Sequence, residues 1–146
     1  MAAYDAQWRG QDEAAASERR RKLAPVADPL LSMVTPLTDK VVVDLGIGTG
    51  TLAFRAIELS PPRRTVGVDF STAGLRAARA VSRHSRFRDM DVEVVKGDME
   101  RLPIARRSAD VVISQATINL IPDKAAVFSE VARIAKSGAR IAISDA

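Results

Sequence analysis

Short apolar runs alternate with longer helical stretches along most of the chain. Five runs have the length and β-branched content of strands, and they occupy residues 41–45, 65–69, 92–96, 109–114 and 139–144. Between them, Thr49 to Leu59 can form a helix, and Ser71 with Thr72 can start another. Strands that alternate with helices form parallel sheets. The pattern therefore predicts an α/β fold, a doubly wound parallel sheet with helices on both faces.

The first 38 residues show no strand pattern. They divide into a polar segment that ends near Arg20 and an apolar segment from Leu23 to Leu37, which is interrupted by Pro25, Pro29 and Pro36. Because proline breaks the helical hydrogen-bond ladder, we expect two short helices here. We accordingly divide the chain into an N-terminal helical segment, 1–38, and a sheet-containing domain, 39–146.

The first strand, 41–45, runs into a glycine-rich turn. Its three consecutive valines fit a strand that is covered on both faces. Asp44 stands near its carboxyl end, and three glycines follow at alternate positions, Gly46, Gly48 and Gly50. Glycine permits a tight turn and lets the backbone approach a ligand, and crevices at the carboxyl ends of parallel strands bind ligands. The segment therefore indicates a nucleotide-cofactor pocket.

The spacing of the glycines narrows the kind of cofactor. The nicotinamide and flavin fingerprint requires its third glycine where this chain has Thr51. The chain has instead an acid two residues before the first glycine, and a carboxylate accepts hydrogen bonds from an ammonium or an amide. A cofactor with an amino-acid part is favoured, and a dinucleotide-dependent oxidoreductase is the weakest interpretation.

Acids also follow the next two strands. Asp69 closes the run 65–69, roughly 20 residues past the glycine turn, where dinucleotide folds hold the ribose hydroxyls. Asp98 follows 92–96 and can accept from an exocyclic amine, while the thioether of Met99 can pack on a flat base. Each acid also has a local explanation, because aspartates cap helices and form turns. Acids at the ends of the first three strands together favour one shared pocket.

These segments resemble the class I S-adenosylmethionine-dependent methyltransferases. The resemblance is carried by Asp44-Leu-Gly-Ile-Gly-Thr-Gly, Gly67-Val-Asp-Phe-Ser, Gly97-Asp-Met and Ala109-Asp-Val-Val-Ile-Ser. It implies a Rossmann-like sheet in strand order 3-2-1-4-5, with S-adenosyl-L-methionine as the cofactor bound by 39–146. The glycine turn and its acid would hold the methionine part, the second acid the ribose and the third acid the adenine amine. The residues expected to bind the cofactor are Asp44, Gly46, Ile47, Gly48, Gly50, Asp69, Phe70, Asp98, Met99, Ser114 and Gln115.

Residues 111–145 are similar to the matching segment of arsenite methyltransferases. Those enzymes hold trivalent arsenic through cysteine thiolates, and soft metalloids select soft sulfur ligands. This chain has no cysteine, and the corresponding loop reads Gln115-Ala-Thr. We therefore expect methyl transfer to another small-molecule acceptor. The alternative is a non-catalytic S-adenosylmethionine-binding module of a larger protein.

The sequence assigns no catalytic residue. Methyl transfer from a sulfonium is a displacement whose leaving group is already activated, so the protein supplies mainly proximity and orientation. No histidine–aspartate or lysine–carboxylate pair that could act as a general base is readable near the pocket. By the resemblance, residues 114–119 face the sulfonium and the acceptor. Tyr4 and Trp8 either stack on one of these groups or anchor the chain terminus.

Composition and charge argue against several classes of protein. With 47% hydrophobic residues, the chain still has no run of roughly 18 apolar residues for a membrane span, and its N-terminus lacks the apolar core of a secretory signal. We expect a cytoplasmic protein. The lack of cysteine and a lone His84 predict no metal site. The net charge of +4 includes arginines spaced as on a solvated helix face, so no nucleic-acid partner is expected. These arginines are Arg76, Arg79, Arg83 and Arg86.

The fifth strand raises the question of association. In the family the sheet continues with a sixth and a seventh strand, whereas this sequence stops at Ala146. Residues 139–144 then form an unpaired and largely apolar edge, and such edges invite association. We expect either that the chain is a fragment of a longer enzyme or that it self-associates through this edge.

Overall fold

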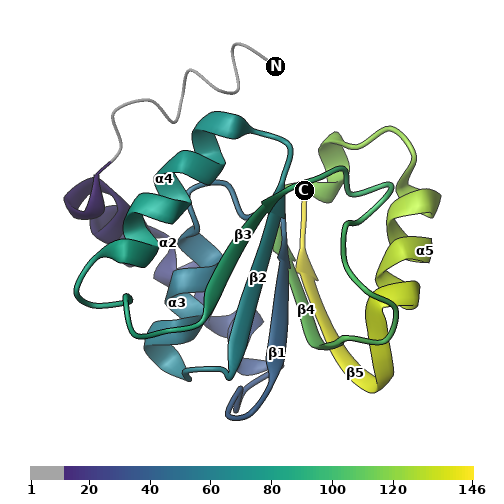
Figure 1. Cartoon of the computed structure of the whole chain (residues 1–146), viewed down its shortest axis with the longest axis horizontal. Helices are drawn as coiled ribbons and strands as arrows, with labels where there is room; N and C mark the ends of the chain where they lie inside the picture. Colours follow the sequence, from purple (N-terminus) through teal and green to yellow (C-terminus); the bar gives the residue numbers. More distant parts are fainter. Residues whose placement is uncertain (1–11) are drawn as a thin grey trace.

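The computed structural model describes residues 12–146, and one parallel sheet forms its centre (Figure 1). The sheet has five strands in the order β3-β2-β1-β4-β5, which confirms the predicted fold class and strand order. The strands are β1 (Val41–Leu45), β2 (Arg64–Asp69), β3 (Val92–Lys96), β4 (Ala109–Gln115) and β5 (Ala135–Ser144). The helices are α2 (Glu13–Ser32), α3 (Thr51–Leu59), α4 (Thr72–Arg83), the short 3-10 helix η1 (Ile118–Leu120) and α5 (Lys124–Ile134).

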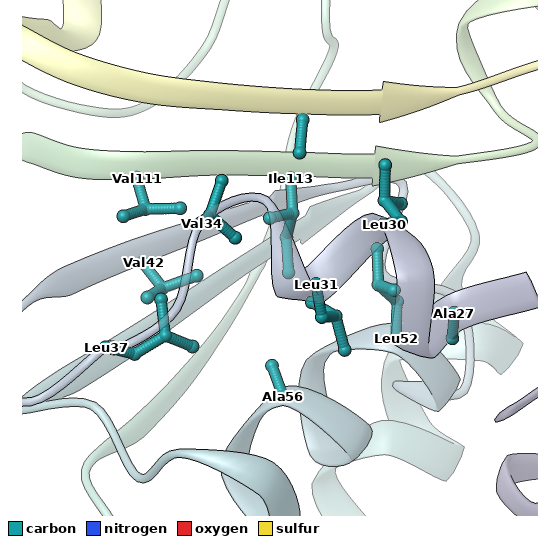
Figure 2. Packing of buried hydrophobic residues seen from close by; sticks show 11 residues of the cluster. Ala27, Leu30, Leu31, Val34, Leu37, Val42, Leu52, Ala56, Val111 and Ile113 are labelled. Atoms are coloured by element: carbon teal, nitrogen blue, oxygen red, sulfur yellow. The ribbon is translucent and has the colours of Figure 1, made fainter.

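Helices cover both faces of the sheet. Helices α2, α3 and α4 lie on one face, and α5 lies on the other (Figure 1). On the first face α2 packs against α3 and against strands β1 and β4, and Figure 2 shows Leu31 of α2 among Val42 of β1, Ile113 of β4 and Ala56 of α3. On the second face, Val127 of α5 belongs to a separate buried cluster over β1, β2 and β4. Because both faces are buried, the middle parts of the central strands are apolar, as in Val42 and Val43 of β1 and 111–113 of β4.

The N-terminal segment differs from the prediction. Glu13 to Ser32 form one continuous helix of 20 residues with Pro25 and Pro29 inside it, so the expectation of two short helices is wrong over this range. Each proline costs about 3 kcal/mol in an isolated helix. Tertiary burial opposes this cost, since Leu30 and Leu31 are buried and each contributes about 1.5–3 kcal/mol. None of the helices within residues 12–146 could span a membrane.

Strand β5 begins earlier than predicted, at Ala135 rather than near residue 139. Ala109 pairs with Ala135 and Val111 pairs with Arg140, so the pairing of β4 with β5 contains a register shift. Gly138, with φ +77°, lies inside the shifted stretch. Residues 135–138 are therefore part of an irregular strand, because glycine accepts the left-handed backbone that the extra residues require.

The last strand forms an edge of the sheet. Within residues 12–146, β5 pairs with β4 alone. Ile141, in the middle of β5, is 46% exposed. On the opposite edge strand, β3, Glu93 forms an ion pair with Arg64 of the neighbouring β2, and charged side chains protect an edge from pairing. The unpaired apolar edge that the sequence predicts is thus at β5.

Candidate functional site

A cavity of about 430 Å³ opens at the carboxyl ends of β1 and β4, beside α2. From the predicted site it contains Asp44, Gly46, Ile47, Gly48 and Gln115. Ala116 and Thr117, from the segment expected to face the acceptor, also line it. The residues that the sequence did not indicate come from α2, from the start of α3 and from the end of β5: Arg19, Leu23, Val26, Thr49, Thr51, Leu52, Ser144, Asp145 and Ala146.

The glycine turn is held in place by the backbone. The amides of Gly46 and Ile47 donate to the carbonyl of Val68 on the neighbouring strand, at 2.8 and 3.1 Å. Gly46 has φ +76°, and a Cβ there would overlap the side chain of Thr117. A side chain at this position is therefore excluded twice, by backbone conformation and by space. Gly50, with φ +87°, is the N-cap of α3 and does not line the cavity.

Asp44 lies at the bottom of this cavity. It is 1% exposed, and its Oδ2 atom has no hydrogen-bond partner among residues 12–146. Burial and the nearby Asp69 carboxylate raise the pKa of Asp44 from 3.8 to about 8, although an amide hydrogen bond from Ala53 opposes the rise. A buried carboxylate needs a partner charge or a proton. The site therefore offers a strong acceptor for a cation.

Asp69 ends β2 and is buried against the glycine turn. Its Oδ2 accepts from the amide of Gly48 at 2.8 Å, and its Oδ1 accepts from the amide of Ser71 at 2.9 Å. The structure thus brings Asp69 to the glycine turn, as expected, but it does not line the cavity. Phe70, the next residue, is half-buried and also lies outside the cavity lining.

The residues after β3 lie away from the cavity. Asp98 is exposed, and its Oδ1 accepts from the amide of Glu100 at 2.8 Å in a local turn. Met99 is 3% exposed and packs in the apolar cluster on the α5 face of the sheet, with Leu45 and Leu102. Neither residue lines the cavity. The three acids end adjacent strands as predicted, but Asp44 alone of them faces the open space.

The end of β4 and the residues after it form another wall of the cavity. Ser114 is fully buried, and its hydroxyl donates to the carbonyl of Leu45 at 2.9 Å, so it ties β4 to β1 rather than lining the cavity. Gln115 does line it. Ala116 follows with φ +54°, a left-handed conformation that is uncommon without glycine, and strained backbone of this kind is concentrated at functional sites.

Helix α2 supplies the remaining wall through Arg19, Leu23 and Val26. These positions follow an i, i+4, i+7 spacing and so share one face of the helix. That spacing is the signal in the sequence that could have identified them, but the sequence does not show which face meets the glycine turn. The aromatic candidates Tyr4 and Trp8 lie outside the described residues.

A parallel sheet with an acid and a glycine turn at the carboxyl end of its first strand defines a nucleotide-cofactor-binding domain of the doubly wound class. The sequence itself identifies the family within this class. The chain belongs to the methyltransferase domain family, whose sequence model matches residues 37–146. The resemblance to methyltransferases is therefore confirmed.

Individual relatives agree with this assignment. An arsenite methyltransferase from Halobacterium salinarum is 37% identical over 108 residues, which are 73% of this chain and 27% of that protein. A demethylmenaquinone methyltransferase from Roseiflexus sp. is 31% identical over 112 residues, 77% of this chain and 45% of that protein. The chain thus spans less than half the length of these two relatives.

Solved structures share the fold. A chain from the complex between a Haloferax volcanii methyltransferase activator and a putative methyltransferase superimposes with a TM-score of 0.76 at 25% identity, over 91% of this chain and 55% of that one. A putative S-adenosylmethionine-dependent methyltransferase from Methanococcus maripaludis gives 0.73 at 23% identity, over 90% of this chain and 63% of that one. The second of these supports the fold alone.

Proposed function

We propose that this chain binds S-adenosyl-L-methionine in the cavity beside the glycine turn and supports methyl transfer to a small-molecule acceptor. The observation that carries the proposal is the unpartnered, buried Oδ2 of Asp44 at the bottom of that cavity. The cofactor carries an α-ammonium group, which is the partner that such a carboxylate requires. The donor set therefore fits the amino-acid end of this cofactor.

Roles for the other expected residues are proposed from the sequence. The glycine turn brings backbone close to the ligand, and Asp69, whose two oxygens accept from the amides of Gly48 and Ser71, remains the proposed ribose ligand. Asp98 is exposed at the end of β3 and is proposed to accept from the adenine amine. Phe70 and Met99 flank these acids in sequence and are proposed to border the ribose and the base.

For methyl transfer from a sulfonium, the protein has mainly to position the two reactants. The bound sulfonium supplies a methyl group with an activated leaving group. Gln115, with the loop that follows it, lies at the same cavity as Asp44, so this loop is proposed to orient the acceptor in line with the methyl group. Leu23 and Val26 on α2 line the same space and would exclude water from it. No general base is assigned.

The acceptor is proposed to be a small molecule. The relatives that match this chain include enzymes named for arsenite and for demethylmenaquinone. With no cysteine in the chain, thiolate binding of arsenic is not proposed. Because the chain spans less than half of these relatives, the alternative is that it is the cofactor-binding part of a larger protein whose acceptor pocket lies in another segment.

The test is isothermal titration calorimetry of this chain with S-adenosylmethionine and S-adenosylhomocysteine, with NAD as the control ligand at the same salt concentration. Micromolar binding of the first two without NAD binding is expected. Binding of NAD alone would identify an oxidoreductase cofactor and reject the proposal. An acceptor screen with radiolabelled methyl groups then separates an active enzyme from a cofactor-binding module.

Self-association through the edge of β5 is proposed as well. The support is the unpaired side of this strand within residues 12–146 and the 46% exposure of Ile141. Sedimentation velocity over a concentration series should show a dimer that Ile141→Lys converts to a monomer. A wild-type monomer at every concentration would reject this interface. A cytoplasmic location stays a prediction from the sequence.

A further inference from the structure

Helix α2 is fixed on the body of the domain by two ion-pair clusters. Towards its start, the buried Arg20 donates to Glu58 of α3 at 2.8 Å and to Glu13 of its own helix at 2.6 Å. Further along, Asp28 receives two hydrogen bonds from Arg55 of α3, both at 2.8 Å. A two-pronged arginine–carboxylate pair fixes orientation as well as distance. These contacts therefore hold α2, and the side chains by which it lines the cavity, in a fixed position.

The face of α2 that lines the cavity begins beside Arg20, at Arg19, and continues between the clusters through Leu23 and Val26. Arg19 is half-buried and borders the same space as Asp44. Among the described residues that line this cavity, Arg19 is the only cationic side chain, and the acidic side chains are Asp44 and Asp145. The guanidinium of Arg19 presents several N–H donors in a planar fork. The cavity thus combines a fixed cation with a buried carboxyl group.

The start of α3 adds to the positive side of the cavity. Thr49, Thr51 and Leu52 line it, and α3 begins at Thr51. The amino end of a helix carries partial positive charge and favours anions. Arg19 and this helix end are therefore two parts of the cavity wall that favour a carboxylate, whereas Asp44 favours an ammonium group.

We propose that Arg19 binds the α-carboxylate of the cofactor and, together with Asp44, selects nucleosides that carry a zwitterionic amino-acid part. This inference rests on the proposed function and names a residue outside the glycine turn and the strand ends. Guanidinium matches the planar carboxylate and can donate two parallel hydrogen bonds to it. Arg19 is thus a binding residue that sets specificity, and it has no role in the methyl-transfer step.

The experiment compares the effect of one substitution on ligands with and without a carboxylate. Calorimetry is carried out with S-adenosylhomocysteine, with S-adenosylmethionine that has been decarboxylated, and with 5′-methylthioadenosine, which has neither ammonium nor carboxylate. Arg19→Gln should weaken binding of S-adenosylhomocysteine by about 10- to 100-fold, as expected for the loss of a charge-assisted hydrogen bond. Its affinity for the two ligands without a carboxylate should stay within about twofold of wild type.

A matched control excludes effects of net charge and of folding. Arg21→Gln removes the same charge from an exposed position on the same helix and should leave all three affinities unchanged. Urea unfolding of both variants should match wild type. Equal losses for all three ligands, or no loss for S-adenosylhomocysteine, would overturn the role of Arg19 while leaving the proposed function intact. If wild type binds none of the three ligands, the proposed function and this inference are both rejected.

Discussion

Replacing Asp44 by asparagine tests whether the bottom of the cavity is built for a cation. The change removes a titratable group and nearly preserves its size. Because the pKa of Asp44 is about 8 in the folded protein and 3.8 ordinarily, the folded state keeps a proton that the unfolded chain has released between these values. The unfolded state then binds fewer protons, so the stability of wild type falls as pH rises from about 4 to about 8 and levels off above.

The magnitude follows from the pKa difference. A rise of about 4 units corresponds to about 5–6 kcal/mol of lost stability above pH 8. The asparagine amide in the same place still lacks a partner, which costs about 1–3 kcal/mol. We therefore expect Asp44→Asn to be more stable than wild type by about 2–5 kcal/mol at alkaline pH and equally or less stable near pH 4.

The assay is urea unfolding followed by far-ultraviolet circular dichroism across this pH range, without any ligand. Asp89→Asn, at an exposed position, is the control for removing a carboxyl group. The informative quantity is the difference in unfolding free energy between Asp44→Asn and wild type as a function of pH. A difference that does not change with pH would refute the burial argument, whatever the cofactor.

Asp44→Asn should bind S-adenosylmethionine more weakly than wild type, although it is the more stable protein without ligand. Near pH 7 the protonated Asp44 must ionise to accept an ammonium group, so binding of S-adenosylmethionine to wild type should release close to one proton. Calorimetry in buffers of different ionisation enthalpy measures this number. Asp44→Asn should bind about 10- to 100-fold more weakly and release no proton. Equal proton release by both proteins would place the ammonium group elsewhere.

Substitutions at three further positions test the geometry of the site. Gly46→Ala should destabilise the fold by at least about 1–2 kcal/mol, because the left-handed backbone and the side chain of Thr117 both oppose a Cβ; an unchanged denaturation midpoint would contradict this. Asp69→Ala removes the acceptor of the Gly48 amide and the proposed ribose ligand, so calorimetric affinity for S-adenosylmethionine should fall, and an unchanged value would reject the assignment. Ala116→Val should cost about 1–2 kcal/mol at φ +54°, whereas Ala116→Gly should be neutral or stabilising in the same unfolding assay; a valine variant as stable as wild type would argue against strain.

The sequence predicts the sheet well because its signals are local. Runs of β-branched residues mark all five strands, and their alternation with helices determines the parallel topology. The glycine turn is predictable for the same reason, since Gly46 requires a conformation that other residues avoid. These features depend on neighbours in sequence, so a reader of the sequence can place Asp44 at the end of β1 without knowing the rest of the fold.

Features that depend on distant parts of the chain were not predictable. Helix α2 continues through Pro25 because tertiary contacts stabilise it. Leu31 is buried in the core, and Arg20 pairs with Glu58, which is 38 residues away in the sequence. Local propensity alone predicts a break there. The position of Arg19 at the cavity follows from the same long-range docking. The engagement of Asp69 by the Gly48 amide, 21 residues apart, likewise cannot be read from either segment alone.

Asp44 destabilises the fold when no ligand is bound. The three preceding residues are valines on a buried strand, and an apolar side chain at the next position would remove the unpaired Oδ2. A chain optimised for folding alone has no reason to bury this carboxyl group beside Asp69, because both burial and repulsion disfavour its charge. A bound cation reverses the sign of that effect. Local inconsistency of this kind is expected at functional sites, and here it coincides with the cavity beside the glycine turn.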